Sequence, residues 1–124
     1  MEFRYSLHPH GPFDAAQSVR WGRERRIPLY VSRVGSKDPL PPLFTIDPRA
    51  VIAESVVPVD GGRGLLVLLY NPAASAAAVS MRSAGGDRLR ISPSGPSGTP
   101  AGPAAEEFRL PAYGARYVRV EPER

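Results

Sequence analysis

Residues 51–72 read VIAESVVPVDGGRGLLVLLYNP, a β-branched segment, a glycine-rich link and an apolar run in succession. The segment at 51–59 favours a strand, and glycine supplies the positive φ angles that a hairpin turn at 60–64 requires. The continuous apolar run at 65–70 is typical of a strand that is buried on both faces. Asn71 and Pro72 then turn the chain. The stretch therefore predicts a β-hairpin whose second strand is buried.

Further short strands are predicted downstream of this hairpin, at residues 76–82, 89–91, 107–110 and 115–120. Turn residues recur about every ten positions, which is typical of an antiparallel sandwich. Residues 92–105 contain four prolines and three glycines and are predicted to form a flexible loop that adds little to the core. We therefore expect an all-β fold, with a small immunoglobulin-like β-sandwich at residues 46–124.

The chain upstream of this sandwich has a different pattern. Phe3, Tyr5 and Leu7 alternate with polar residues, which predicts a strand over residues 3–7. Asp14 can cap a short helix from residue 15 to about 25, and Pro28 ends it. A short strand is predicted near residues 29–34, and residues 35–49 are interpreted as a connection. Residues 1–45 thus form a strand, a helix and a linker in front of the sandwich.

Composition excludes several kinds of site. The sequence of 124 residues contains no cysteine, so disulfides, thiolate metal sites and a cysteine nucleophile are excluded. No apolar run approaches the roughly 20 residues of a membrane-spanning helix. The net charge is +4, and fifteen of the sixteen basic residues are arginine. Four of these arginines cluster around Glu24, namely Arg20, Arg23, Arg25 and Arg26. This cluster leaves open a weak nucleic-acid interface.

Residues with catalytic chemistry are sparse. His8 and His10 are the two histidines of the chain; they are weak metal candidates because Pro9 separates them and no third ligand is near in sequence. Glu54 could be a site carboxylate, but a solvent-facing position is favoured. There is no serine-nucleophile motif and no pair of carboxylates of the glycosidase type. We therefore predict no catalytic residue in this chain.

Aromatic side chains offer another kind of site. Sugars are commonly bound on aromatic faces next to planar polar groups, and tryptophan and arginine are enriched at interfaces. Trp21, beside the arginine cluster, is the aromatic residue that a core position explains least well. We therefore expect carbohydrate or interface contacts at Trp21, Arg23 and Tyr113.

Five stretches, in this order, resemble the C-terminal region of glycoside hydrolase family 38 α-mannosidases. They are residues 3–10, 27–29, 51–59, 64–72 and 108–120. The chain departs from the family pattern at Pro58 and Val59, where a Leu-Lys pair is frequent, at Leu69, where arginine is frequent, and at Tyr113 and Gly114. The likeness runs over nearly the whole chain.

The resemblance implies a carboxy-terminal fragment or a split-off subunit of such an enzyme. Residues 3 to about 43 would be the last piece of its central β-supersandwich, and residues 46–124 its small terminal sandwich. The catalytic zinc and the nucleophile of the family belong to an N-terminal domain that no segment here matches. The partners it implies are a catalytic α-mannosidase domain or chain and mannosides, without nucleic acid or membrane.

Two alternatives to this interpretation stay open. One is a stand-alone carbohydrate-binding sandwich, and the other is the nucleic-acid binder with the cluster at residues 20–26. For the mannosidase module we expect a location in the bacterial cytoplasm and self-association through exposed strand edges.

Overall fold

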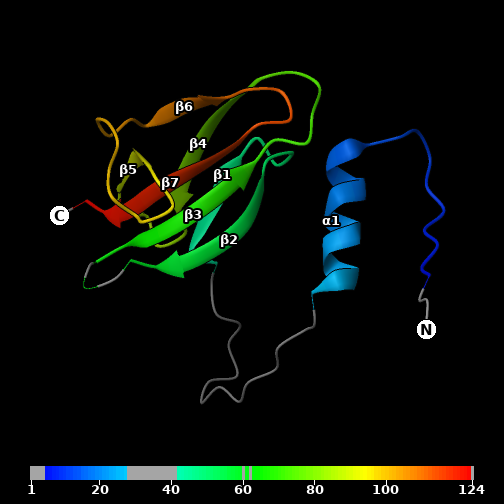
Figure 1. The fold of residues 1–124 in the computed structure, drawn as a ribbon, viewed down its shortest axis with the longest axis horizontal. Coiled ribbons are helices and arrows are strands. Elements are labelled where there is room, and N and C mark those ends of the chain that lie inside the picture. The colour runs from blue at the N-terminus through cyan, green and yellow to red at the C-terminus, as the bar shows by residue number, and fades with distance from the viewer. Residues whose placement is uncertain (1–4, 28–41, 60, 62, 124) are drawn as a thin grey trace, which may run out of the picture.

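The computed structural model describes residues 5–27, 42–59, 61 and 63–123. Within these ranges one helix precedes seven strands. The helix α1 spans Ala15–Arg26 and stands beside the strands, with the N-terminal segment along its far side (Figure 1). The strands are β1 (Phe44–Asp47), β2 (Ile52–Pro58), β3 (Leu65–Tyr70), β4 (Ala77–Ser83), β5 (Leu89–Ser94), β6 (Glu107–Leu110) and β7 (Ala115–Pro122).

The described strands form two antiparallel sheets, as the sequence predicts for a sandwich. One sheet has the order β1-β4-β6 and the other has the order β2-β3-β7-β5. Each of the strands predicted downstream of residue 50 is confirmed, with ends that shift by a few residues. Proline occurs in three strands. Pro58 in β2 and Pro93 in β5 belong to edge strands, and Pro122 is the last residue of β7, beyond its pairing with β3. This placement follows from the missing N–H of proline, which a central strand would need for its ladder.

The β2–β3 hairpin turn contains glycines at positive φ, as predicted. Gly61 has φ 61° and Gly64 has φ 147°. A Cβ on Gly64 would come within 2.8 Å of the Val120 carbonyl oxygen and of the Glu121 side chain on β7. Gly64 is therefore required both for its backbone conformation and for the close approach of β7.

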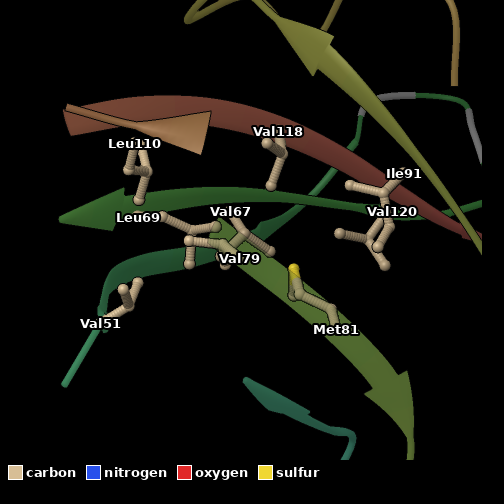
Figure 2. Packing of buried hydrophobic residues seen from close by; sticks show 9 residues of the cluster. All are labelled: Val51, Val67, Leu69, Val79, Met81, Ile91, Leu110, Val118 and Val120. Carbon is tan, nitrogen blue, oxygen red and sulfur yellow. The ribbon is translucent and has the colours of Figure 1, made fainter. Parts of the chain in front are cut away.

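The core lies between the two sheets (Figure 2). Alternate residues of β3 and β7 point inward from the four-stranded sheet, and β4 and β6 contribute from the other sheet. Leu69, Val67, Val79 and Leu110 are fully buried. The cluster of buried apolar residues is Val51, Val67, Leu69, Val79, Met81, Ile91, Leu110, Val118 and Val120. This burial is the main favourable contribution to the stability of the sandwich.

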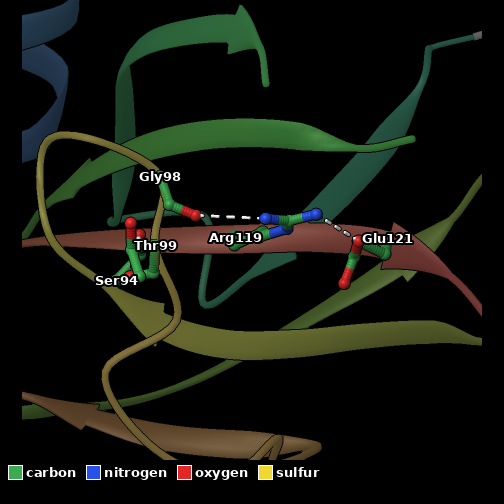
Figure 3. Close-up of polar contacts among 5 residues, drawn as sticks. All are labelled: Ser94, Gly98, Thr99, Arg119 and Glu121. Atoms are coloured by element: carbon green, nitrogen blue, oxygen red, sulfur yellow. Dashed lines mark hydrogen bonds and ion pairs between the residues drawn. The ribbon is translucent and has the colours of Figure 1, made fainter. Parts of the chain in front are cut away.

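Residues 95–100, which we name the strap, cross the outer face of the four-stranded sheet (Figure 3). Arg119 points to that face, because its neighbours Val118 and Val120 are in the core. Its guanidinium donates to the Gly98 carbonyl over 3.3 Å and to the Glu121 carboxylate over 2.7 Å. Ser94 Oγ donates to the Thr99 carbonyl over 3.1 Å. The strap is thus fastened by polar contacts to β5 and β7.

The loop predicted at residues 92–105 is wrong at its beginning. Strand β5 continues to Ser94, inside the predicted loop, and Ser92 is buried. The loop also has backbone partners, since Ala101 donates to the Pro93 carbonyl and Ala105 to the Ile91 carbonyl, over 2.7 and 2.8 Å. The proline and glycine content of residues 92–105 does not predict these hydrogen bonds, because their acceptors are backbone carbonyls of strand β5.

Asn71, the only asparagine in the sequence, connects the two loops at one end of the sandwich. It is fully buried. Its side-chain amide donates to the carbonyls of Ser75 and Pro111 over 2.8 and 3.0 Å, and its Oδ1 accepts from the Ala73 N–H over 3.1 Å. The Asn71 N–H donates to the Gly114 carbonyl over 2.9 Å. The residue therefore fastens the β3–β4 connection to the β6–β7 turn.

Helix α1 begins and ends as predicted. The Asp14 carboxylate accepts from the Gln17 N–H over 2.9 Å at the N-terminus, and Ile27 ends the helix directly before Pro28. No residue of α1, all of which is described, is buried. The helix is therefore not part of the sandwich core.

Two predictions upstream of the sandwich are wrong. Tyr5, Ser6 and Leu7, the described residues of the predicted strand at 3–7, lie outside any strand, and Tyr5 and Leu7 are 86% and 95% exposed. Strand β1 (Phe44–Asp47) lies within the predicted connection and pairs with β4. The predicted boundary between residues 45 and 46 falls inside this strand. The predicted strand near residues 29–34 lies outside the described residues.

The variant Leu69→Ala tests the core. Leu69 is fully buried, so its truncation should lower the free energy of unfolding by about 2–5 kcal/mol, the range found for cavities in well-packed cores. Urea unfolding followed by circular dichroism measures the change. Leu7→Ala is the control, since Leu7 is exposed and should change this free energy by less than about 0.5 kcal/mol. Equal losses in both variants would contradict the assignment of the core.

The variant Asn71→Ala tests the connection between the two loops. It removes three side-chain hydrogen bonds and leaves buried backbone groups unpaired, so we expect a loss of about 2–3 kcal/mol of unfolding free energy. Ser75→Ala is the matched control, because Ser75 contributes its backbone carbonyl, which the variant keeps. A neutral Asn71→Ala variant in the same unfolding assay would show that the loops hold their conformation without this amide.

Candidate functional site

The structure places the predicted contact residues in two parts of the molecule. Trp21 and Arg23 belong to helix α1, whereas Tyr113 lies in the turn between β6 and β7. Tyr113 is 64% exposed and has a positive φ of 53°. Its N–H donates to the Ala73 carbonyl over 3.1 Å, which fastens it to the β3–β4 connection. The three predicted contact residues therefore do not form one site: Trp21 and Arg23 lie on the helix, and Tyr113 lies in a separate turn.

Trp21 is engaged by side chains of its own chain. The His8 ring stacks on it, with ring centroids 5.1 Å apart and planes inclined by 21°. The Arg25 guanidinium lies 5.9 Å from the centroid of the same ring, within the range of a cation–π contact. Trp21 is consequently half-buried and joins the N-terminal segment to the helix.

The two histidines do not come together with further metal ligands. His8 stacks on Trp21, and the Nδ1 of His10 lies 2.8 Å from the Gly11 carbonyl oxygen. Over residues 5–27, 42–59, 61 and 63–123, no group of three His, Cys, Asp or Glu side chains could hold a metal ion.

A cleft of about 470 Å³ lies between helix α1 and the segment that contains β1 and β2; we name it the α1–β2 cleft. Two polar contacts join its lining residues across it. The Arg23 guanidinium pairs with the Glu54 carboxylate, and the Arg20 guanidinium donates to the Arg49 carbonyl. Its lining mixes charged and apolar side chains: Arg20, Arg23, Glu24, Ile27, Phe44, Ile46, Arg49, Val51, Ile52, Ala53 and Glu54.

Glu54 is the carboxylate at the centre of these contacts, and its predicted solvent-facing position is wrong. Its side chain is 10% exposed. A β-bulge in the β2–β3 ladder, between Ala53 and Ser55, leaves Glu54 without an opposite residue. One oxygen pairs with Arg23, whereas Oε1 is buried and has no hydrogen-bond partner among the described residues. Oε1 is therefore an unsatisfied acceptor that is shielded from solvent.

The arginines at residues 20–26 do not form one continuous basic surface, because their side chains contact different partners. Arg20 and Arg23 reach toward the sandwich, and Arg25 lies against Trp21. Sequence reasoning missed Arg49 and undervalued Glu54 as functional candidates. The isolated carboxylate within the apolar segment 51–59 was the available signal for Glu54, whereas nothing local pointed to Arg49.

A second cleft, of about 510 Å³, opens between β4 and β5, which belong to different sheets. Its charged lining is balanced between three basic and three acidic residues: Arg82, Arg88, Arg90, Asp87, Glu106 and Glu123. None of these side chains is buried. The α1–β2 cleft differs from it in having a largely buried carboxylate, and it is the better candidate site.

The α1–β2 cleft can form hydrogen bonds of both directions. A carboxylate oxygen accepts, and each guanidinium carries five N–H donors in a fixed plane. The apolar side chains beside them provide a surface for C–H groups. This chemistry fits recognition of a small polar molecule.

No family model, no curated protein and no solved structure matches this chain. Among the described residues, no helix has the length and apolar character needed to cross a membrane.

The variant Arg23→Met tests how the helix is held. Without the guanidinium, Glu54 loses its partner, and we expect backbone amides of α1 to exchange with deuterium at least about twofold faster. Amides of β3 and β7 should keep their rates. Arg26→Met is the matched control, since Arg26 is an exposed residue at the end of the same helix. Unchanged exchange in α1 would contradict a role of the ion pair in positioning the helix.

Proposed function

We propose that this chain is a non-catalytic C-terminal β-sandwich module of an α-mannosidase-like enzyme of glycoside hydrolase family 38. It is a fragment or a split subunit that completes the fold of the parent enzyme and borders its carbohydrate-binding cleft. The zinc and the nucleophile belong to the partner domain or chain. A location in the bacterial cytoplasm is part of the proposal.

The observation that carries the proposal is the exposed apolar N-terminal segment. Tyr5, Leu7 and Phe13 are 86%, 95% and 75% exposed, although the sandwich already has a closed core without them. Single exposed apolar residues are ordinary on protein surfaces, but three within nine positions of one segment favour an interaction site. A neighbouring domain of a larger enzyme would cover them.

The order of elements supports the same proposal. In the resemblance, residues 46–124 correspond to the small terminal sandwich, and the observed sandwich extends from Phe44 to Pro122. The residues before it correspond to the last piece of a larger sheet assembly, which agrees with an apolar segment that lies outside the sandwich core.

A stand-alone carbohydrate-binding sandwich is the second candidate. The exposed Tyr113 ring favours it, since a sugar could stack on that ring. The nucleic-acid alternative has less support, because two of the four clustered arginines are engaged with the sandwich.

The first test concerns the apolar segment. The full chain should self-associate in size-exclusion chromatography with light scattering, because Tyr5, Leu7 and Phe13 are exposed apolar side chains. The triple variant Tyr5→Ser, Leu7→Ser, Phe13→Ser should elute as a monomer with unchanged unfolding free energy. The control is Ile27→Ser with Val57→Ser, two exposed apolar sites elsewhere, which should still self-associate. A wild-type chain that stays a stable monomer would contradict the proposal.

The second test concerns the enzyme. A bacterial family 38 α-mannosidase that lacks its C-terminal sandwich should regain hydrolysis of a chromogenic α-mannoside when this chain is added. The triple serine variant should restore less activity than the wild-type chain. Restoration by neither chain would argue against the assignment to this enzyme family, and the first test would then decide whether the segment is an interaction site of another kind.

A further inference from the structure

We propose that strand β6 (Glu107–Leu110) is a docking edge for a second copy of this chain, which adds its own β6 in antiparallel orientation about a two-fold axis at Phe108. In this arrangement Glu107 of each copy lies opposite the partner's Arg109. The two three-stranded sheets then continue into each other across the axis. The inference is independent of the proposed function, because it concerns an edge of the sandwich and not the N-terminal segment.

Four strands lie at the edges of the two sheets, and three of these edges are obstructed. Along β5, two carbonyls accept from the N–H groups of Ala101 and Ala105. On β2, the bulge at Glu54 and the missing N–H of Pro58 interrupt the edge. Strand β1 lines the α1–β2 cleft beside the helix. In contrast, β6 lies at the margin of the sandwich (Figure 1), and the described residues form no backbone hydrogen bond on its outer side.

The hydrogen-bond pattern of the ladder decides which backbone groups of β6 face outward. In the pairing of β1 with β4, the Ala84 N–H donates to the Leu43 carbonyl, in line with the register of the two strands. Hydrogen-bonded pairs alternate along an antiparallel ladder, so the even-numbered residues of β4 bond to β1 and the odd-numbered residues bond to β6. Phe108 lies opposite an odd-numbered residue of β4. Its N–H and C=O groups therefore point to β4, whereas those of Glu107 and Arg109 point outward.

The outward backbone groups and the charges together select one register. Two β6 strands that meet about a two-fold axis must pair their outward residues with each other. An axis at Phe108 places Glu107 opposite the partner's Arg109, and Arg109 opposite the partner's Glu107. An axis at either charged residue would place like charges opposite each other, which is destabilising. The order of a carboxylate, an aromatic ring and a guanidinium along β6 is therefore self-complementary.

The side chains of this strand are available to a partner. Glu107 and Arg109 are exposed, and neither forms an ion pair with another of the residues that the structure describes. Phe108 is part-buried against the core, on the opposite face of the strand. Opposite residues of a non-hydrogen-bonded pair have Cα atoms about 4.5 Å apart, so the two Phe108 side chains would meet at the axis and contribute an aromatic pair.

The contact is short, and its dimer is therefore weak. It would contain about four backbone hydrogen bonds, with one ion pair on each side of the axis. Such an interface is smaller than the roughly 1,200 Å² that stable complexes bury. We expect a dissociation constant on the order of 0.1–1 mM. The dimer dissociates at the micromolar concentrations of a chromatography run, so association through the N-terminal segment can be measured separately.

Concentration-dependent ¹H–¹⁵N correlation spectra of the triple serine variant test the contact without the N-terminal association. Between about 0.05 and 2 mM, a range that brackets the expected dissociation constant, the amides of Glu107 and Arg109 should shift. The amide of Val56, on the edge strand β2, is the internal control and should keep its position. Constant positions of all three amides over this range would overturn the proposal.

Charge reversal tests the register in the same background. Arg109→Glu places like charges opposite each other and should weaken the association at least tenfold. Adding Glu107→Arg reverses both charges, restores the complementary order and should recover the original dissociation constant. Arg90→Glu, at an exposed position of the edge strand β5, is the matched control and should associate as the triple serine variant does. Equal association by Arg109→Glu, or a double variant that stays dissociated, would contradict the proposed pairing.

Disulfide trapping reads the register directly, because the sequence contains no cysteine. Glu107→Cys and Arg109→Cys, each in the triple serine background, are mixed at millimolar concentration and oxidised. The mixed disulfide should exceed its statistical share, since the two cysteines are opposite each other and the remaining charges still pair. Mass spectrometry separates it from the two like dimers, and a statistical mixture would place the axis elsewhere. Failure of these tests leaves the proposed function intact, because self-association and reconstitution there depend on the N-terminal segment.

Discussion

Everything else in this molecule depends on the burial of apolar side chains between two sheets of different strand order. The described strands of the two sheets share no ladder, so packing of residues such as Leu69 and Val79 joins the sheets. Because a strand presents alternate residues to each face, the same packing fixes the register of β3 and β7 and sends Arg119 to the outside. The strap and its arginine contacts are therefore a consequence of how the core is filled.

Polar contacts hold individual loops in place and do not join the two sheets. Asn71 holds two loops at one end of the sandwich, and Arg119 holds the strap on its outer face. At the helix, polar contacts replace a hydrophobic interface, since α1 has no buried residue and reaches the sandwich through Arg20 and Arg23. A helix held in this way can border a cleft instead of filling it.

The sandwich strands could be predicted from the sequence because alternation and turn residues are local signals. Strand β1 was missed because flanking prolines suggested a connection, whereas its pairing with β4 is decided by residues far along the chain. The strand predicted for Tyr5 and Leu7 has the right alternation but no partner strand in the sandwich. For the site, Trp21 and Arg23 were visible as unusual residues on a helix. The burial of Glu54 was not, because it follows from a bulge in the ladder.

The position of Trp21 has a practical consequence for stability measurements. It is the only tryptophan in the sequence, and it lies on the helix against His8 and Arg25, outside the apolar cluster of the sandwich. Intrinsic tryptophan emission therefore reports on the attachment of the helix and is silent about the interior. Its midpoint in a denaturation curve need not coincide with the loss of β-structure, and a difference between the two would describe two melting units within one polypeptide.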